Sequence, residues 1–299
     1  MLSSEPSATP TGDLAGRLDK CETEMAKIAV DLSVDVYEGT FNGDNVRPDQ
    51  LGFYLTEDDA ALTAKVTGKF CDICAVAFRG TTLDGSDWAS NFDLDPAPLL
   101  PCSTCATTEG FFGAYNFAHR EKVEDDARNC VAECSTCKLV LTGHSQGGAI
   151  ATIAAIALKD LNPYVYTYGA PGSLSNGCKP FIKSAQWFRF IHSNLNFADL
   201  LGYDPIPTTA TGTLVGREYY ISSEDNTAAA YTGTDVHRDN LPYNPDAHSI
   251  AGYKTTLDNF GDNIETDGWA NGSPCTEDWE CKSGNCDGCT LGLYCECEA

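Results

Sequence analysis

The chain has 299 residues, of which 42% are hydrophobic and 21% are charged, a composition typical of a folded globular protein. Its formal net charge of -24 would repel phosphate backbones and anionic membrane surfaces, so we expect no nucleic-acid partner. No apolar stretch reaches the roughly 18 residues that a membrane-spanning helix needs. The length suits one large catalytic domain with a small appendage, and we expect a monomer.

The first part of the chain predicts a tail, a helix and three strands. After a flexible tail over 1–18, the spacing of Met25, Ile28, Ala29 and Leu32 predicts an amphipathic helix over 21–36. Aliphatic and aromatic runs then predict strands, joined as in a meander, over 51–56, 61–67 and 73–78.

The middle of the chain predicts alternating helices and strands. A long helix is expected over 111–133, followed by a buried strand over 139–142. The segment 149–159 is apolar nearly all round, as in a helix packed against a sheet. Two further strands, over 164–168 and 187–192, complete an α/β pattern.

The composition changes after Trp269. Six cysteines follow between residues 275 and 297, in a segment too short for a hydrophobic core of its own. We therefore predict a main domain over 19–269 and a cysteine-rich module over 270–299 held by disulfides. Its role is open between surface binding and a stable cap.

Fifteen cysteines indicate either an oxidising compartment or metal binding. Three C-x-x-C pairs in the main domain resemble zinc ligands, but we favour disulfides and expect neither metal nor cofactor. The odd count implies one free or intermolecular cysteine. We expect a secreted protein, although the first residues lack the basic start and apolar run of a signal peptide. A mature form with an added Met explains that start.

Gly143, Ser145 and Gly147 form a G-x-S-x-G pattern between the buried strand and the apolar helix. In this context the pattern indicates a nucleophile elbow, where a serine occupies a strained strand-to-helix turn that its glycine neighbours make sterically possible. A plain glycine turn is the alternative, and it is less consistent with the strand and helix on either side. We predict Ser145 as a nucleophile.

The general base is found by elimination among five histidines. The chain order in hydrolases with this elbow is serine, acid, histidine, which excludes the two histidines before Ser145 and disfavours His192. His237 lies in a charged loop, whereas His248 precedes an apolar segment and suits a helix start that faces the core. We favour His248, with His237 as the alternative.

The acid is expected in the loop after the strand over 187–192, because triad members lie at strand ends. Asp199 and Asp204 are the candidates there. Asp199 lies in an apolar run, while Asp204 is followed by Pro205-Ile206-Pro207, whose prolines restrict the backbone and hold the carboxylate in place. We favour Asp204.

Ordered motifs around these residues resemble the fungal-type (class 3) lipases over most of residues 21–260. The first is Phe-Arg-Gly-Thr-Thr at 78–82, with Asp-Trp at 87–88 and Asn-Phe-Asp at 91–93, similar to the family's oxyanion-loop and lid signature. Others are Tyr-Gly-Ala-Pro at 168–171, Asp-Pro-Ile-Pro at 204–207 and Glu-Tyr-Tyr at 218–220.

The resemblance implies an α/β-hydrolase fold, with a mostly parallel central sheet flanked by helices. It implies Ser145, Asp204 and His248 as catalytic triad, and Thr81 with the backbone N–H of Gln146 as oxyanion hole. The chain departs from the family at Gln146, where leucine is common, and lacks two non-catalytic histidines. The first departure alters the floor of the pocket or its oxyanion side.

Residues 84–95 place Trp88, Phe92 and Leu94 among four aspartates. This amphipathic stretch predicts a lid over the site, whose apolar residues also bind substrate; a fixed loop with a buried Trp88 is the alternative.

The sequence therefore predicts a carboxylic ester hydrolase, first of all a triacylglycerol lipase acting on acylglycerols at a lipid-water interface. A feruloyl-type or other soluble-ester esterase is the alternative within the fold. A non-catalytic binding protein is less consistent with a complete, correctly ordered triad.

Overall fold

The computed structural model describes residues 18–38, 52–55, 61–81, 95–100, 104–118, 120–183, 186–192, 204–208, 212–221, 228–231 and 245–259, with four short strands beyond them. The five α-helices of this part are α1 (Lys20–Glu38), α2 (Glu109–Phe117), α3 (Arg120–Glu133), α4 (Gln146–Ala157) and α5 (Ile250–Asn259). None of them has the length and hydrophobicity of a membrane span.

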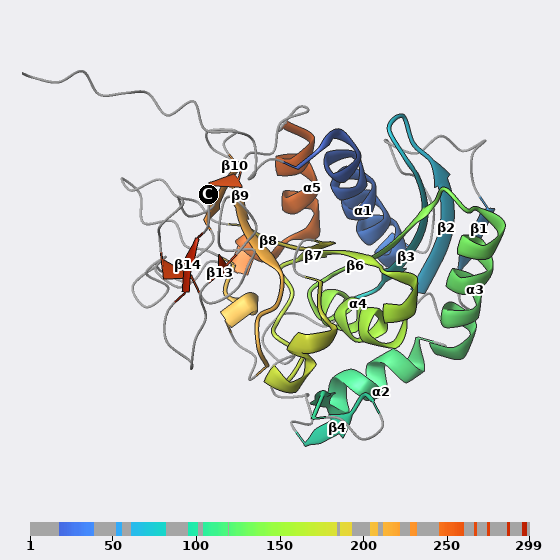
Figure 1. Cartoon of the computed structure of the whole chain (residues 1–299). Coiled ribbons are helices and arrows are strands. Elements are labelled where there is room, and N and C mark those ends of the chain that lie inside the picture. Colours follow the sequence, from blue (N-terminus) through green and yellow to red (C-terminus); the bar gives the residue numbers. More distant parts are fainter. Residues whose placement is uncertain are drawn as a thin grey trace, which may run out of the picture.

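The described strands of the main sheet follow the order β1-β2-β3-β6-β7-β8-β9-β10-β11 (Figure 1). They are β1 (Gly52–Leu55), β2 (Ala61–Thr67), β3 (Asp72–Phe78), β6 (Lys138–His144), β7 (Tyr164–Tyr168), β8 (Trp187–His192), β9 (Arg217–Ile221), β10 (Ala228–Tyr231) and β11 (Thr266–Asp267). The five central strands from β3 to β9 are parallel. The pairs β1–β2, β2–β3 and β9–β10 are antiparallel, and β10 pairs parallel with β11. The short hairpin β4 (Pro96–Pro98) and β5 (Ala106–Thr108) lies outside this sheet.

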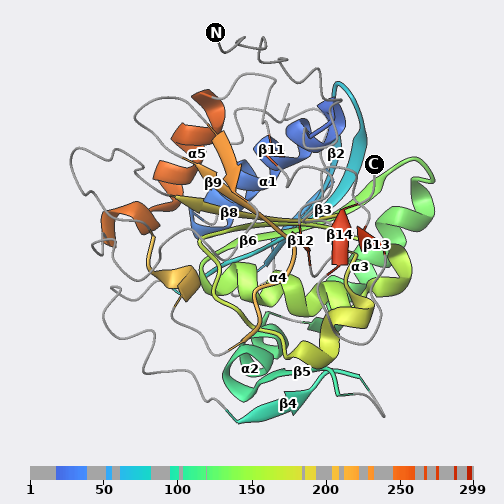
Figure 2. The ribbon, with the colours of Figure 1, turned by 60° about the vertical axis from the view of Figure 1, so that its left-hand side comes forward.

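Helices cover both faces of the sheet, with α1 and α5 on one side and α2, α3 and α4 on the other (Figure 2). Alternate residues of β3 enter the two cores: Val76 and Phe78 pack with α4, while Ala75 and Ala77 pack with α1. A strand that is buried on both faces has an uninterrupted apolar sequence. This explains why β3, β6, β7 and β8 could be predicted from their apolar runs, whereas β9, with the sequence Arg-Glu-Tyr-Tyr-Ile, was not predicted as a strand.

The helix predicted over 111–133 is wrong as one element, because α2 ends at Phe117 and α3 begins at Arg120. Phe111 and Tyr115 are the buried residues of α2, and Val123 and Ala127 those of α3. On one continuous helix of about 100° per residue, the second pair would point about 120° away from the first. The break lets both helices turn their apolar pairs to the core.

Four disulfides lie in the described part, and they confirm the preference for disulfides over zinc ligands. They join Cys21 to Cys71, Cys74 to Cys130, Cys105 to Cys178 and Cys134 to Cys137. The neighbours Cys71 and Cys74 therefore bind different distant partners. Cys102 and the side chains of the six C-terminal cysteines lie outside the described residues.

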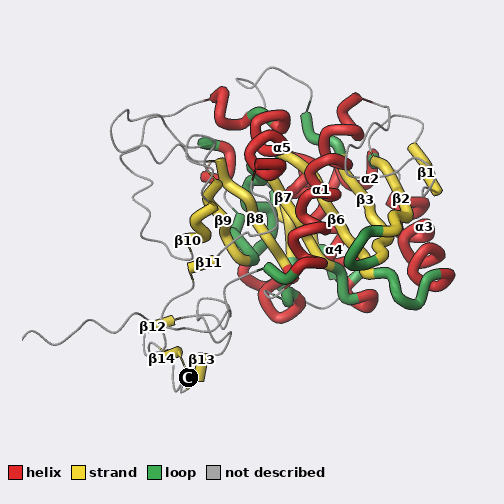
Figure 3. Tube along the Cα trace, turned by 90° about the horizontal axis from the view of Figure 1, so that it is seen from above, coloured by secondary structure: helices red, strands yellow, loops and turns green. Residues whose placement is uncertain are grey.

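The strands β12 (Pro274–Cys275), β13 (Cys286–Asp287) and β14 (Cys295–Cys297) form a small antiparallel sheet of their own (Figure 3). The cysteine-rich module over 270–299 and its boundary at residue 270 stay a prediction. Leu18, the last residue of the predicted tail, is buried in the core beside α1; the rest of that tail lies outside the described residues.

The junction of β6 and α4 is packed backbone against backbone. A Cβ atom on Gly143 would lie 2.3 Å from the carbonyl carbon of Gly147, and one on Gly147 would lie 2.0 Å from the carbonyl oxygen of Phe78. No side chain fits at either position. The glycines of the predicted elbow are thus explained by the close approach of β3, β6 and α4.

Gly147→Ala is expected to lower the free energy of unfolding by at least about 3 kcal/mol, because the new methyl group overlaps the backbone of β3. Gly113→Ala is the matched control, since Gly113 lies on an exposed part of α2 with no atom within 4 Å of the new Cβ. That change should stabilise the protein by about 0.5–1 kcal/mol. Urea unfolding of both variants measures the contrast, and a tolerated Gly147→Ala would refute the packing argument.

Replacing both Cys105 and Cys178 by alanine is expected to destabilise the protein by at least about 4 kcal/mol, against about 2 kcal/mol for Cys134 and Cys137. The first disulfide spans 73 residues and the second spans 3, so the first removes more chain entropy from the unfolded state. Urea unfolding without reductant tests this ranking. Equal losses would show that loop entropy does not control these contributions.

Candidate active site

Ser145 lies in the turn between β6 and α4, with φ of 57° and ψ of -130°. A positive φ is unfavourable for a residue with a side chain and persists only where the surroundings enforce it. Here the Ser145 N–H donates to the carbonyl oxygen of Tyr168 at 2.9 Å, and its own carbonyl accepts from the N–H of Gly148 at 3.0 Å. The turn presents the hydroxyl at the carboxyl end of the parallel strands.

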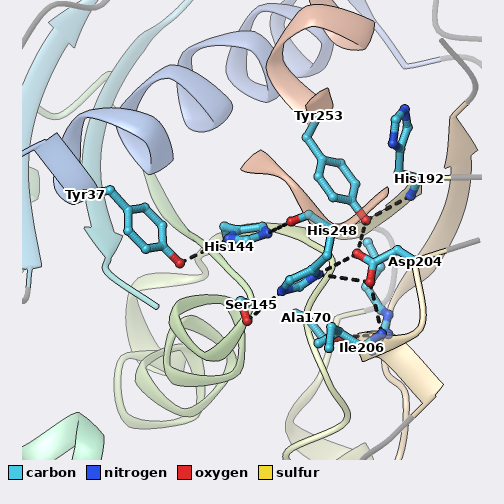
Figure 4. Close-up of polar contacts among 10 residues, drawn as sticks. Tyr37, His144, Ser145, Ala170, His192, Asp204, Ile206, His248 and Tyr253 are labelled. Atoms are coloured by element: carbon cyan, nitrogen blue, oxygen red, sulfur yellow. Dashed lines mark hydrogen bonds and ion pairs between the residues drawn. The ribbon is translucent and has the colours of Figure 1, made fainter. Parts of the chain in front are cut away.

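His248 and Asp204 complete a hydrogen-bonded line that starts at this hydroxyl (Figure 4). The Nε2 atom of His248 lies 2.9 Å from Ser145 Oγ, and its Nδ1 lies 2.9 and 2.8 Å from the two carboxylate oxygens of Asp204. A carboxylate only accepts, so Nδ1 carries the proton and Nε2 is free to accept from the serine. The three predicted residues are thus brought together from three distant segments.

Asp204 is fully buried, and its carboxylate is held by donors on both oxygens. Tyr253 donates its hydroxyl to Oδ2 at 2.6 Å, and the N–H of Ile206 donates to Oδ1 at 2.9 Å. Burial and then the charge of Asp204 raise the pKa of Tyr253 well above its usual value, so the phenol stays a donor. A buried charge is tolerated when hydrogen bonds replace its hydration in this way.

Tyr253 and Asp204 are also tied to the end of β8. The backbone N–H of His192 donates to the Tyr253 hydroxyl oxygen at 2.9 Å, and its carbonyl accepts from the Asp204 N–H at 2.9 Å. His192 itself is buried beside Thr256, and burial lowers its pKa. His192 therefore has a structural role, in agreement with the sequence argument that disfavoured His192 as the general base.

His144 supports His248 from the other side. Its Nε2 lies 2.7 Å from the His248 carbonyl oxygen, and its Nδ1 lies 3.0 Å from the hydroxyl of Tyr37 on α1. Burial and the neighbouring His248 lower the pKa of His144 well below its usual value, so the ring is neutral. Since a carbonyl only accepts, Nε2 donates to His248 and Nδ1 accepts from Tyr37.

Thr81 and Gln146 are brought together beside Ser145. The hydroxyl of Thr81 donates to Oε1 of Gln146 at 2.6 Å. Gln146 is the first residue of α4, where backbone N–H groups have no partner within the helix. Such an N–H is available to a developing negative charge next to Ser145.

The predicted lid residues Trp88, Phe92 and Leu94 lie outside the described residues, as do the rival candidates Asp199 and His237. Sequence reasoning missed the supporting residues, above all Tyr253 and Tyr37. The apolar segment around Tyr253 was read as core, and no pattern in the sequence connects Tyr37 with a strand that begins a hundred residues later.

The comparisons with known proteins all find similarity to lipases. The sequence profile of the family lipase (class 3) matches residues 75–201. Secreted mono- and diacylglycerol lipase A of Penicillium cyclopium is 28% identical over 170 residues, 54% of this chain and 52% of that protein. Secreted mono- and diacylglycerol lipase 1 of Fusarium solani is 35% identical over 102 residues, 32% of this chain and 29% of that protein. The chain thus spans about half the length of the first relative and less of the second.

Solved structures show the same fold. A fungal lipase in complex with an inhibitor has a TM-score of 0.58 and 18% identity, covering 81% of this chain and 98% of that one. A mutant of the Penicillium cyclopium enzyme has a TM-score of 0.56 and 22% identity, covering 80% and 97%. These similarities confirm the predicted α/β-hydrolase fold, and the match over residues 75–201 shows that this part of the chain is similar to the class 3 lipases.

Proposed function

We propose that this protein is a carboxylic ester hydrolase, specifically a triacylglycerol lipase that acts through an acyl-enzyme on Ser145. The observation that carries the proposal is the continuous line from Ser145 Oγ through His248 to the buried Asp204. A neutral imidazole with Nδ1 fixed as donor leaves Nε2 as a base at the serine, which is what an ester-cleaving nucleophile requires.

In the acylation step, Ser145 Oγ bonds to the ester carbonyl carbon while its proton passes to His248 Nε2. Asp204 stabilises the resulting imidazolium through Nδ1–H. The carbonyl oxygen becomes an oxyanion facing the Gln146 N–H and Thr81, and the tetrahedral intermediate collapses as His248 protonates the leaving alcohol. Water then repeats the sequence on the acyl-enzyme and releases the fatty acid.

Acylglycerols are the proposed substrates because the matched relatives are named as mono- and diacylglycerol lipases and one of the similar structures as a triacylglycerol lipase. We also propose that Trp88, Phe92 and Leu94 form a lid that opens at a lipid surface, and that the protein is a secreted monomer. These relatives are named as secreted, which supports the proposed secretion of this protein.

Ser145→Ala should abolish ester hydrolysis, lowering kcat by a factor of about 10⁶ relative to the wild type, because no other group described at the site can accept the acyl chain. Hydrolysis of p-nitrophenyl esters from short to long acyl chains, together with emulsified triolein, measures this. Long-chain and triolein turnover by the wild type that vanishes in the variant supports the lipase.

Other outcomes would change the proposal in defined ways. Turnover of short soluble esters alone would retain Ser145 but make the protein a soluble-ester esterase of the feruloyl type. Activity that survives Ser145→Ala would overturn the mechanism. A wild type without any turnover would point to a binding protein instead.

Tyr253→Phe is expected to lower kcat/KM about tenfold, because the buried Asp204 loses its shortest donor and holds His248 less firmly. Tyr166→Phe is the matched control: its hydroxyl is also part of the core but donates to the Glu22 carbonyl on α1, away from the site. The two variants should lose similar thermal stability. Equal kinetic losses would show that Tyr253 acts through general stability alone.

A further inference from the structure

The hydroxyl of Thr81 is engaged by a side chain in the structure. Its single proton is donated to Oε1 of Gln146 at 2.6 Å. A hydroxyl has one proton to give, so Thr81 cannot keep this bond and donate the same proton to an oxyanion. Gln146 therefore does more than supply a backbone N–H.

The register of the sheet explains why these two side chains meet. In the parallel pair β3 and β6, Phe78 lies opposite Gly143. Thr81 and Gln146 each follow three residues later, where both chains leave the sheet beside Ser145. Gly147 packs against the Phe78 carbonyl, so the two segments are in backbone contact three residues before Thr81 and one residue after Gln146.

We propose that the carboxamide of Gln146 is a positioning residue that controls the hydroxyl of Thr81. In the free enzyme Oε1 accepts the Thr81 proton and holds the hydroxyl in one orientation. In the transition state the proton turns to the oxyanion, and the carboxamide rotates so that Nε2–H donates to Thr81 Oγ1. This inference rests on the proposed function.

Hydrogen-bond chemistry gives the direction of this exchange. An oxyanion is a stronger acceptor than a neutral amide oxygen, since bonds to a charged group are about twice as strong. Once the proton has turned, Oε1 would face a lone pair of Thr81 Oγ1, and rotation replaces that repulsion with a donor. A donor on Oγ1 also polarises the hydroxyl toward the oxyanion.

Among glutamine, leucine and ionised glutamate, only glutamine can both accept a hydrogen bond from Thr81 and donate one to it. Leucine offers neither donor nor acceptor. Gln146→Leu therefore removes the side-chain hydrogen-bond partner of the Thr81 hydroxyl but keeps the backbone N–H of residue 146. Glutamate is isosteric and, when ionised, only accepts; it would retain the proton of Thr81 and place a negative charge beside the oxyanion. The two substitutions therefore separate positioning from packing.

The test is a double-mutant cycle on Gln146→Leu and Thr81→Val, read on kcat and KM for a soluble short-chain p-nitrophenyl ester. Gln146→Leu should lower kcat about tenfold with KM changed less than twofold. In the Thr81→Val background the same substitution should change kcat less than twofold. Thr81→Ser keeps the hydroxyl and should keep the dependence on Gln146.

Gln146→Glu provides the pH readout. Its kcat relative to the wild type should fall as pH rises through the range in which the new carboxyl ionises, and recover at lower pH. Two results would overturn the proposal: equal effects of Gln146→Leu with and without the Thr81 hydroxyl, or a loss in Gln146→Glu that does not change with pH. A change confined to KM would assign Gln146 to the acyl pocket and reject it as a positioning residue.

Phosphonylation separates this inference from the proposed function. With a p-nitrophenyl alkylphosphonate, Ser145 Oγ bonds to phosphorus, p-nitrophenolate leaves and the serine proton passes to His248. If the wild type hydrolyses no carboxylic ester but is phosphonylated, the proposed function fails, and the same cycle measured on the phosphonylation rate decides the role of Gln146. If neither reaction occurs, both are overturned.

Discussion

The contact between the Phe78 carbonyl and Gly147 is the constraint on which the site depends. Because the backbones of β3 and α4 touch there, the chain must turn sharply at Ser145 and hold a positive φ. The same contact brings Thr81 next to Gln146. The proposed nucleophile and oxyanion donors are therefore positioned by one backbone contact.

The proposed base and acid, His248 and Asp204, are positioned differently, by polar side chains of the helices on one face of the sheet. Tyr37 from α1 reaches His248 through His144, and Tyr253 from α5 holds Asp204. Tyr253 is fully buried and Tyr37 is partly buried, and burial raises the pKa of both phenols, so that each keeps its proton. The helix layer of α1 and α5 thus fixes the two partners of Ser145, while α4 fixes Ser145 itself.

The sequence predicted what depends on local pattern and chain order. The buried strands follow from uninterrupted apolar runs, and the elbow from glycines that flank Ser145. The break at residue 118 was missed because two short amphipathic helices in succession have the same period as one long helix. Tyr253 and Tyr37 were missed because their hydroxyls gain a role only when distant segments meet. Disulfide partners were open for the same reason: Cys71 and Cys74 are neighbours in sequence, but their disulfides lie on opposite faces of the main sheet.

The connectivity of the cysteines has a consequence for how the protein can be produced. The loops closed by Cys74–Cys130 and Cys105–Cys178 overlap along the chain, so a newly made chain offers Cys74 and Cys105 several wrong thiols before the right partners are available. Correct pairing then depends on exchange of early bridges rather than on order of synthesis. A recombinant host must supply a compartment with disulfide isomerisation, because oxidation alone would trap mispaired chains.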